Sequence, residues 1–472
     1  MPAKVSNIRQ LIENGATREI QQARATLLNA YEQTLAAADP ERLILEQLHL
    51  DGELLRLQNQ VFALDRFRKI SVVGAGKAGA AMVSALENVL GSRISNGYVN
   101  VTSADPARSG KFTLNDSPVC LSPGDIILNH AGHPVPDAAG LAGAQAIIDI
   151  AAQAGEDELL ICLLSGGGSS LLPLPRYPVS LADKQQVTGQ LLRSGASISE
   201  INTVRKHISA VKGGWLAKKA WPATVINLIL SDVPGDPLEF IASGPTAPDS
   251  TTFADALAVL RRFELYASAP KAVIQLLEAG VDGRVDETPT ADDPVFARVF
   301  NRVIGNNLIA RQAMAGALAA AGFQVDMAGS VCTGSLESVV RDMACQIRSL
   351  VVRRQAEGPF AVVAGGEVNL QVTGSGKGGR NQEMALMMAS HLEGCENTLF
   401  AALSTDGIDG PTNAAGALLD AGTLRRARAA GLCPDDYLRR HDSWHFFSVL
   451  GDLVCTGYTG TNVNDLFVCL VI

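Results

Sequence analysis

The sequence is poor in aromatic residues and in charge, and it has no excess of positive charge. Aromatic residues make up 5% and charged residues 18% of its 472 residues, and 48 acidic side chains outnumber 39 basic ones. The net charge of −9 argues against a protein that binds nucleic acid or an anionic membrane surface, because both carry negative charge. An anionic small-molecule substrate would therefore need a local cluster of cations to bind it.

Long apolar runs and cysteine pairs are also missing. No apolar stretch reaches the roughly 18 residues of a membrane-spanning helix, and the N-terminal segment lacks the apolar core of a secretion signal. None of the eight cysteines forms a C-x-x-C pair, and most lie in apolar runs such as LICLL and LFVCLVI. We therefore expect buried free thiols in a reducing compartment, and a cytoplasmic protein.

The sequence contains enough hydrophobic residues to form more than one core. Hydrophobic residues make up 47% of the chain, and a chain of this length exceeds one ordinary domain. Residues 1–66 are polar and periodic, which predicts helices. From residue 69, short apolar runs alternate with helical segments, as in a parallel sheet with helices on both faces. A polar stretch at 281–296 with two prolines predicts a linker or an exposed crossover, and a second alternating pattern follows it.

The predicted fold class is therefore α/β with two domains. We expect a Rossmann-like parallel-sheet domain over residues 1–282, which includes the helical N-terminal segment, and a smaller α/β domain over residues 297–472. In open parallel sheets, ligands bind where strands end. The loops that follow apolar strands are therefore the candidate binding sites.

The first such loop, in KISVVGAGKAGAAMVSAL at 69–86, has the spacing G-x-G-x-x-G of a dinucleotide site, with Gly74, Gly76 and Gly79. Lys77 stands inside the turn. A dinucleotide site would also place an Asp or Glu at the end of the next strand to bind the ribose, but that strand ends in NVTSAD and its first acid, Asp105, comes late. We expect Lys77 to face a phosphoryl oxygen or a carboxylate. A solvated loop lysine is the alternative.

The second loop, in LLSGGGSSLL, has three consecutive glycines. Glycine leaves its backbone N–H group open and tolerates positive φ, so such a loop suits phosphate oxygens at the start of a helix. A tight turn with a capping serine is the alternative interpretation. The phosphate-binding candidates are Ser165, Gly166, Gly167, Gly168 and Ser169.

A third glycine-rich segment, GSGKGGRNQE, carries two cations, Lys377 and Arg380. It lacks the G-x-x-x-x-G-K-[ST] pattern of a Walker A loop. Mobile glycines around two cations suggest a clamp for phosphate or carboxylate, since arginine binds either group in bidentate fashion. A flexible surface hairpin is the alternative.

Carboxylates follow several strands and are candidates for a metal ligand or a general base. Phosphoryl transfer uses Mg²⁺ held by one or two carboxylates, and a carboxylate can accept the alcohol proton. Each Asp could instead cap a helix or an Asx turn. The candidates are Asp232, Asp236 and Glu239 in one segment, Asp406 and Asp409 in another, and Glu367 in GGE. As metal ligands we select Asp232, Glu367 and Asp406.

The segment EINTVRKHISAVKGG at 200–214 predicts a helix with a cationic face. Arg205 and Lys212 are seven residues apart and so share one face, and Asn202 lies near the start. Such a face could bind a small carboxylate, although an ordinary solvated face is the alternative. His133, in the loop NHAGHPVPD, could hydrogen-bond a substrate or could be a structural histidine.

Taken together, these motifs resemble the glycerate 2-kinase family, whose C-terminal half is called the MOFRL domain. The resemblance rests on GAGKAG, LLSGGGSSLLP, NTVRKHISAVKGG, SDVPGDPLEFIASGPTAPD, GGEVNLQVTGSGKGGRNQE, STDGIDGPTNAAGA and TGTNVNDL, in this order, and covers residues 65–470. It implies an ATP-dependent kinase that converts D-glycerate to 2-phosphoglycerate with a divalent cation such as Mg²⁺. It also implies two α/β domains with the active-site cleft between them.

The resemblance further implies that Lys77 and Arg380 face the substrates or the transferring phosphoryl group, and we add Asp232 as a catalytic carboxylate. We expect the ATP phosphates to lie against the loop at 165–170. The glycerate carboxylate would meet the cations of 202–212 or Arg380. Substituting Lys77 or Arg380 is expected to leave folding unaffected.

Other interpretations stay open. An NAD(P)H-dependent hydroxypyruvate reductase would need the missing ribose acid, and a non-catalytic sensor would bind a ligand without turnover. A kinase for another 2-hydroxy acid, such as tartronate, would keep the same fold. The expected partners are glycerate and ATP, with neither nucleic acid nor membrane, and we expect a homodimer.

Overall fold

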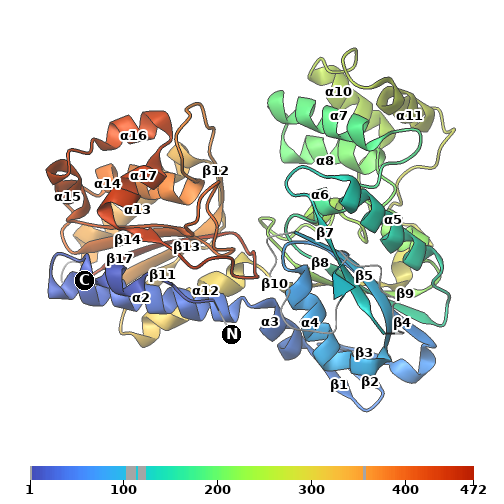
Figure 1. Cartoon of the computed structure of the whole chain (residues 1–472), viewed down its shortest axis with the longest axis horizontal. Coiled ribbons are helices and arrows are strands. Elements are labelled where there is room, and N and C mark those ends of the chain that lie inside the picture. The colour runs from blue at the N-terminus through green and yellow to red at the C-terminus, as the bar shows by residue number, and fades with distance from the viewer. Residues whose placement is uncertain (1–2, 103–112, 115–123, 355–357) are drawn as a thin grey trace. The chain divides into compact units, whose positions relative to one another are not determined.

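The computed structural model describes residues 3–102, 113–114, 124–354 and 358–472. The chain forms two compact units (Figure 1). Unit 1 consists of Met1–Arg42, Asp232–Gly235 and Gly305–Ile472, and unit 2 of Leu43–Ser231 and Asp236–Ile304. Among the helices of the described residues, none is long and apolar enough to cross a membrane.

Unit 2 is built around a largely parallel sheet, as predicted. The strand order is β10-β9-β8-β4-β5-β7-β6, and the neighbours from β9 to β6 run parallel. β8 and β9 are buried at every residue, which explains their unbroken apolar sequences. The strands are β4 (Lys69–Ala75), β5 (Ile94–Thr102), β6 (Thr113–Leu114), β7 (Ile126–Ala131), β8 (Glu158–Leu164), β9 (Thr224–Leu230) and β10 (Val299–Gly305).

Helices connect and cover these strands. Three of them begin with a capping box, in which a Ser or Thr and an Asp or Glu three residues later satisfy each other's backbone N–H groups. The helices of unit 2 are α3 (Pro40–Gln47), whose first residues belong to unit 1, α4 (Gly79–Leu90), α5 (Ala138–Ala152), α6 (Gly168–Leu171), α7 (Leu181–Arg193), α8 (Ile198–His207), α9 (Trp215–Ala220), α10 (Phe253–Arg262) and α11 (Lys271–Val281). α7, α8, α10 and α11 share one apolar core.

The predicted helix at 200–214 is shorter than expected, because α8 ends at His207. The hydroxyl of Ser209 accepts hydrogen bonds from the N–H groups of Val211 and Lys212. Such a local side-chain bond competes with the helical pattern. Gly213 and Gly214 then adopt positive φ angles of 55° and 81°. Lys212 therefore lies in a turn and not on the same helix as Arg205.

The prediction of helices throughout residues 1–66 is wrong for its last part. α1 (Ile8–Glu13) and α2 (Arg18–Ala37) precede α3, but β1 (Leu48–Asp51), β2 (Leu54–Leu57) and β3 (Gln60–Ala63) form an antiparallel sheet. The sequence of this part alternates in polarity and has Asp-Gly at the first turn, which is a hairpin signal.

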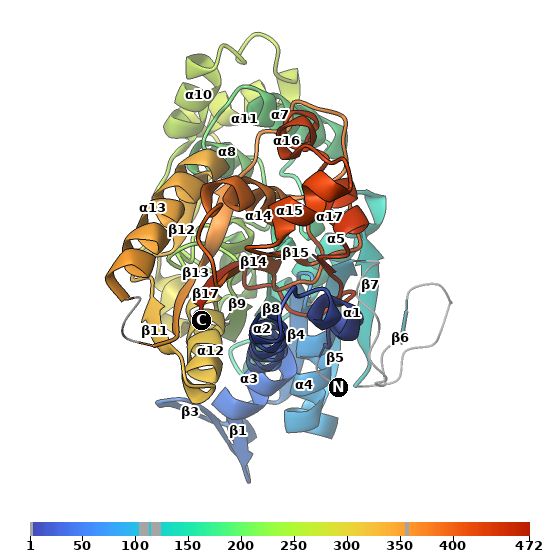
Figure 2. The same ribbon diagram turned by 90° about the vertical axis from the view of Figure 1, so that its left-hand side faces the viewer.

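Unit 1 contains a mixed, mainly antiparallel sheet of order β11-β13-β17-β14-β15-β16, with β12 beside β13. Figures 1 and 2 show α2 and α12 side by side along one face and α13 and α14 over the other. The strands are β11 (Gln324–Met327), β12 (Cys332–Ser335), β13 (Phe360–Asn369), β14 (Thr398–Ser404), β15 (Gly416–Asp420), β16 (Leu453–Val454) and β17 (Asp465–Val471). The further helices are α12 (Asn307–Ala320), α13 (Leu336–Arg354), α14 (Arg380–His391), α15 (Thr423–Ala429), α16 (Pro434–Arg440) and α17 (Ser443–Leu450).

The two units divide the chain differently from the predicted boundary. The first helices belong with the C-terminal sheet, because Arg24 of α2 pairs with Asp420 and the Tyr31 hydroxyl donates to the Ser404 carbonyl at 2.6 Å. The stretch predicted as a linker packs back on unit 2, where Thr288 is buried. The boundary instead falls between residues 304 and 305.

The cysteines are only partly as expected. All seven in the described residues are free thiols, and Cys162 and Cys469 are buried. Cys345 and Cys433 are exposed instead, because Cys345 lies on the polar face of the amphipathic helix α13 and Cys433 directly precedes α16. Cys120 lies outside the described residues.

Candidate active site

The two predicted glycine loops of unit 2 lie directly against each other. β4 and β8 are parallel neighbours, so the loops that follow them leave the same edge of the sheet. The backbone N–H group of Lys77 donates to the Gly166 carbonyl at 2.8 Å, and the N–H group of Ala78 donates to the Ser165 hydroxyl at 3.0 Å. The structure therefore brings Lys77 and the SGGGSS segment together.

Glycine is required where these loops meet. A Cβ atom on Gly76 (φ 153°) would lie 1.9 Å from the Ser165 hydroxyl oxygen. A Cβ atom on Gly167 (φ 81°) would lie 2.9 Å from His133 and 3.4 Å from Cγ of Lys77. Because contacts under 3.0 Å do not occur for real Cβ atoms, any side chain would force these segments apart. The same contacts show that Lys77, His133 and Gly167 converge.

The SGGGSS segment presents open hydrogen-bond donors. No described residue accepts a hydrogen bond from the backbone N–H group of Gly166, Gly167 or Ser169. Gly74 of β4 lies against β8 just before this segment, because a Cβ atom on Gly74 would lie 2.3 Å from the Leu163 carbonyl oxygen. The helix that follows, α6 from Gly168, is only one turn long, so these N–H groups, more than a helix dipole, make the segment suitable for an anion.

The end of β5 does not supply a dinucleotide-type acid. Asn100 is buried there, donates to the carbonyls of Gly140 and Leu171, and accepts from Asn129. The amide side chain thus holds neighbouring segments in place. Asp105 lies outside the described residues.

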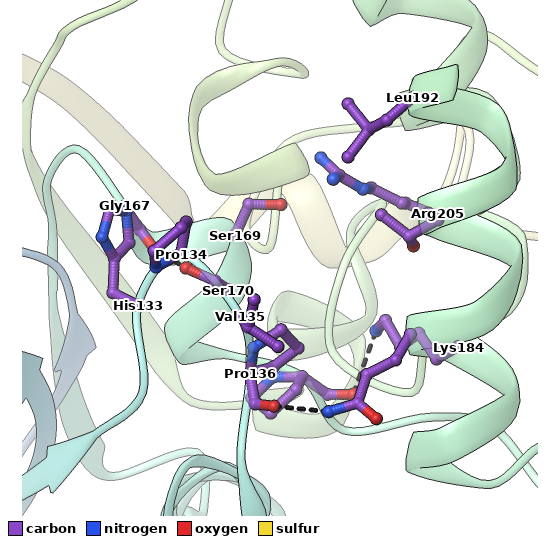
Figure 3. A pocket seen from close by; sticks show the side chains of 14 residues that line it. His133, Pro134, Val135, Pro136, Gly167, Ser169, Ser170, Lys184, Leu192 and Arg205 are labelled. Atoms are coloured by element: carbon purple, nitrogen blue, oxygen red, sulfur yellow. Dashed lines mark hydrogen bonds between the residues drawn. The ribbon is translucent and has the colours of Figure 1, made fainter. Parts of the chain in front are cut away.

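A pocket of about 330 Å³ opens beside the SGGGSS segment (Figure 3). α7 and α8 form one wall, and the loop from His133 and the segment from Gly167 to Pro173 form the other. Arg205 of α8 points into it, as does the Ser169 hydroxyl from the opposite side. Of the predicted substrate ligands, this pocket brings together His133, Gly167, Ser169 and Arg205.

Lys184 and Arg205 line this pocket and the fully buried Lys212 lies next to them, and none of the three has an acidic partner among the described residues. Lys184 of α7 donates to the Pro173 carbonyl at 3.0 Å, and Lys212 donates to the Ser169 carbonyl at 2.8 Å. Arg205 makes no hydrogen bond or ion pair with any described residue. Buried charges are normally paired, so this cation cluster (Lys184, Arg205 and Lys212) is suited to an external anion.

The cations also disfavour one another's charge. Burial and the neighbouring Arg205 lower the pKa of Lys184 to about 7. Burial, together with Lys184 and Arg205, lowers the pKa of Lys212 well below its ordinary value. Burial likewise lowers the pKa of Arg205. An anion bound among them would relieve this mutual repulsion.

We expect the stability of the ligand-free protein to rise with pH because of Lys184. The pKa of Lys184 is about 7 in the folded chain and has the ordinary lysine value in the unfolded chain. Between these two pH values, Lys184 is protonated in the unfolded chain but neutral in the folded one. The free energy of unfolding then rises through this window by up to about 1.4 kcal/mol per pH unit. Arg205, Lys212 and the Pro173 carbonyl are the described groups that face Lys184.

Urea denaturation at pH 7 and pH 9 tests this, with Lys184→Met as the comparison. The wild-type protein should gain more stability than the variant between these pH values. Equal gains in the two proteins would show that Lys184 is charged in the fold.

Asn202 and Lys206 do not join the cation cluster. Asn202 accepts a hydrogen bond from Ser243, which also contacts the Ser169 hydroxyl at 2.9 Å, so Asn202 supports the SGGGSS segment from behind. Lys206 is fully buried and pairs with Asp249 at 2.6 Å and Glu239 at 3.2 Å. Glu239 is therefore a structural partner in this structure.

In unit 1, Arg380 is the first residue of α14 and lies between two carboxylates. Its Nε donates to Asp465 at 2.6 Å and its Nη1 to Glu367 at 2.7 Å, while Nη2 bonds to no described residue. Burial alone would lower the pKa of Arg380, but Asp465 and Glu367 outweigh it and raise the pKa. Asp465 is completely buried, so Arg380 also stabilises the fold.

Other predicted acids of unit 1 hold the backbone in position. Asp409 is buried and accepts hydrogen bonds from the N–H groups of Asn381 and Gln382, which caps α14 from another loop. Burial raises its pKa to about 7, against the effect of these donors. Asp406 accepts from the Ser404 hydroxyl at 2.6 Å, and Asp232 accepts from the Asn462 amide at 3.1 Å.

Lys377 does not contact the carboxylates around Arg380. Its ammonium group lies 3.9 Å from the centre of the Trp444 ring, a cation–π contact. Its backbone N–H group donates to Asp442. The segment around it is also tied to Arg440 and Ser443, which approach its glycines closely.

The selected metal ligands do not form a dense metal cluster. The described residues contain no group of three or more His, Cys, Asp or Glu side chains arranged to hold a metal ion. Mg²⁺ in phosphoryl-transfer sites needs only one or two carboxylates, and phosphates and water complete its coordination. As hard oxygen donors, Asp232, Asp406 and Glu367 fit that chemistry.

Two family models match the chain. Residues 26–278 match a domain of unknown function, DUF4147, and residues 360–465 match the MOFRL family. A glycerate 2-kinase from Pyrococcus horikoshii is 38% identical over 445 residues, which cover 93% of this chain and 95% of that protein. The chain belongs to the glycerate 2-kinase family.

Other relatives are similar to this chain over the same extent. A crystal structure of a glycerate kinase from Thermotoga maritima matches with a TM-score of 0.79 and 34% identity, over 96% of this chain and 100% of that one. A protein from Agrobacterium vitis that carries a provisional hydroxypyruvate reductase name is 37% identical, over 95% of this chain and 94% of its own. The resemblance predicted from the motifs is confirmed.

The motifs of this family did not reveal all the residues at the site. Lys184 lies on the buried face of α7, three residues before Val187 and seven before Leu191. A lysine at an otherwise apolar position of an amphipathic helix could have identified it as a candidate. Asp465 and Asn462 lie in TGTNVNDL, whose polar residues directly precede the last apolar strand. β17 runs antiparallel to β13 and β14, so its start lies at the edge where those two strands end. Only the tertiary structure shows this placement.

Proposed function

We propose that this chain transfers the γ-phosphoryl group of ATP to the 2-hydroxyl group of D-glycerate, giving 2-phosphoglycerate and ADP. The observation that carries the proposal is the convergence of Lys77 with the open N–H groups of the SGGGSS segment at one edge of the sheet. Donors and cations in this arrangement suit a phosphoryl group. Membership of the glycerate 2-kinase family supplies the substrate.

In the proposed reaction, the 2-hydroxyl oxygen attacks the γ-phosphorus. The new P–O bond forms as the bond to the ADP oxygen breaks, and a carboxylate accepts the hydroxyl proton; Asp232 is our candidate. Lys77 neutralises negative charge on the transferring phosphoryl oxygens. Arg380 is already balanced by two acids, so we propose that it acts through its Nη2 donor.

We propose Mg²⁺ as the divalent cation, held by one or two of Asp232, Asp406 and Glu367. When bound, Mg²⁺ neutralises phosphate charge and orients the phosphates for attack. We assign the glycerate carboxylate to the cations of residues 202–212 or to Arg380, as the sequence suggests. We also propose the cytoplasm as the location, since the described cysteines are free thiols, and the homodimer stays a prediction.

A coupled assay tests the proposed function directly. Purified protein with D-glycerate, ATP and Mg²⁺ should release ADP only when D-glycerate is present, and the product should be 2-phosphoglycerate. A parallel reaction holds hydroxypyruvate and NADH. Tartronate in place of glycerate measures the strictness for the acceptor.

The outcomes separate the alternatives. Consumption of NADH without ADP release would contradict the kinase and support a reductase, although β5 itself carries no acid that could bind a ribose. Binding of ATP without any turnover would favour a sensor. Faster turnover of tartronate than of glycerate would keep the reaction and change the substrate.

A further inference from the structure

The pocket beside the SGGGSS segment has an apolar wall that phosphoryl transfer itself does not need. Prolines 134, 136 and 173 line it together with Val135 and Leu192. Val135 is 65% exposed and Leu192 is 60% exposed, so both present apolar surface at the pocket. Apolar walls with few polar groups are typical of sites for a sizeable organic ligand.

The opposite part of the pocket is cationic. The half-buried guanidinium group of Arg205 lacks a partner in the described residues, and the fully buried Lys212 bonds to the backbone beside Ser169. Gly167 and Ser169, whose N–H groups donate to no described residue, line the same pocket as Arg205. One ligand with an apolar end and several negative charges would satisfy both parts.

We propose that this pocket binds the nucleoside end of ATP, with its phosphates directed to Arg205 and the SGGGSS segment. The inference rests on the proposed phosphoryl transfer and deepens it by assigning the nucleotide subsite. The pocket of about 330 Å³ lies within the ~300–1,000 Å³ range of sites for ligands of this size. Glycerate is a small polar acid with one carboxylate, so it matches neither the apolar wall nor the cations beside it. Of the two positions proposed above for its carboxylate, this inference therefore leaves Arg380.

Two side chains of α7 provide the polar groups for the base. Gln185 donates from Nε2 to the Pro136 carbonyl at 2.7 Å, and its carbonyl oxygen accepts no hydrogen bond from any described residue. That oxygen can therefore accept from an amino group of the base. Thr188 lines the same wall one turn along the helix. A few polar groups in an apolar wall are enough to orient such a ligand.

Gly189 gives a direct test, because it lines the pocket from within α7. A Cβ atom there would meet only the mobile end of Arg193, at 3.3 Å, so helix α7 tolerates a side chain. Gly189→Phe should fill the pocket and raise the Kd for ADP, measured by calorimetry without glycerate, about tenfold or more. The KM for glycerate should stay within about twofold.

The control is the same substitution on a helix of unit 1. Gly316→Phe places the ring on α12, where a Cβ atom meets nothing within 4 Å. We expect its ADP affinity to equal that of the wild-type protein. Circular dichroism and the thermal midpoint confirm that both variants fold.

Arg205→Met provides a second variant that leaves the pocket open. Loss of a charged donor should raise the Kd for ADP about tenfold or more. The thermal midpoint of the ligand-free protein should not fall, because Arg205 has no described partner to lose.

The results separate this inference from the proposed function. ADP binding that is unchanged in Gly189→Phe, or absent from the wild-type protein, would overturn the nucleotide pocket. A rise in the KM for glycerate with unchanged ADP affinity would also overturn it, while the kinase would stand. If the wild-type protein binds ADP and Gly189→Phe does not, the inference is supported even where glycerate is not phosphorylated.

Discussion

Replacement of Lys77 by methionine is expected to lower kcat for glycerate phosphorylation by about 100-fold or more, because an electrostatic contact to the transferring group is lost. The thermal midpoint should stay unchanged, since the variant keeps the backbone bond to Gly166 and the length of the side chain. The coupled assay gives kcat and KM separately. A rise in KM with unchanged kcat would mean that Lys77 stabilises the bound substrate and the transition state equally, which would contradict the proposed role.

Lys69→Met is the matched control for this experiment. Lys69 begins β4, the strand that ends just before Lys77, and so lies at the opposite edge of the sheet. We expect Lys69→Met to keep the wild-type kcat. Near wild-type turnover in Lys77→Met would show that the assigned role is wrong.

Substituting Lys77 tests the catalytic role more directly than substituting Arg380 does. The sequence suggests that both can be replaced without affecting the fold, but Arg380 neutralises the buried carboxylate of Asp465. Removing one partner of a buried ion pair is strongly destabilising. An Arg380 variant would therefore lose stability together with activity.

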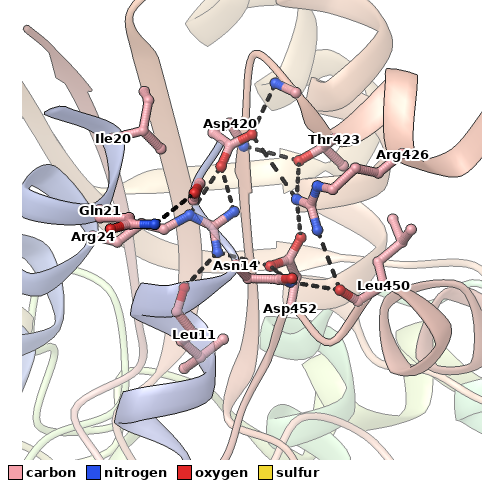
Figure 4. Close-up of polar contacts among 12 residues, drawn as sticks. Leu11, Asn14, Ile20, Gln21, Arg24, Asp420, Thr423, Arg426, Leu450 and Asp452 are labelled. Atoms are coloured by element: carbon pink, nitrogen blue, oxygen red, sulfur yellow. Dashed lines mark hydrogen bonds and ion pairs between the residues drawn. The ribbon is translucent and has the colours of Figure 1, made fainter. Parts of the chain in front are cut away.

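Replacement of Arg24 by methionine is expected to destabilise unit 1 by about 3–5 kcal/mol. Arg24 is fully buried in α2 and donates to Asp420 at 2.9 Å, and to Asp452 and the Leu11 carbonyl at 2.8 Å each (Figure 4). Its removal leaves two buried carboxylates that, among the described residues, only Arg426 can balance. Urea denaturation followed by circular dichroism measures the shift.

Arg9→Met provides the comparison. Arg9 pairs with Glu13 on α1, but both side chains are largely exposed, and exposed pairs contribute little to stability. We expect no measurable shift of its unfolding midpoint. An equally small effect of Arg24→Met would contradict the packing of the N-terminal helices on the C-terminal sheet.

Local patterns predicted the loops of the candidate site well. The apolar strands β4 and β8 and the glycines after them can be recognised from neighbouring residues, and parallel strands bring their ends to one edge. This is why Lys77, Gly167 and Ser165 were expected near a common ligand.

Two other features were missed, the first despite a local signal and the second because it depends on how the chain folds back. Residues 48–63 form hairpins and not helices, because alternation and an Asp-Gly turn outweigh helical periodicity there. The expected helix through Lys212 stops at His207, yet Lys212 still lies beside Arg205 because the chain turns back. A short window of sequence shows the hairpin signal, but it does not show that Lys212 lies beside Arg205.

The sequence by itself determined the order of strands and loops, the family, and the residue types that an anion needs, because these depend on patterns within a few residues. Only the tertiary structure decided which charges are paired. Arg24 meets Asp420 across 396 positions of the chain, and Asp465 neutralises Arg380. Lys184, Arg205 and Lys212 gather with no acidic partner in the part of the chain that the structure describes. Such pairings depend on how distant segments pack and exclude water, and burial then determines which cation serves the fold and which is left for a ligand.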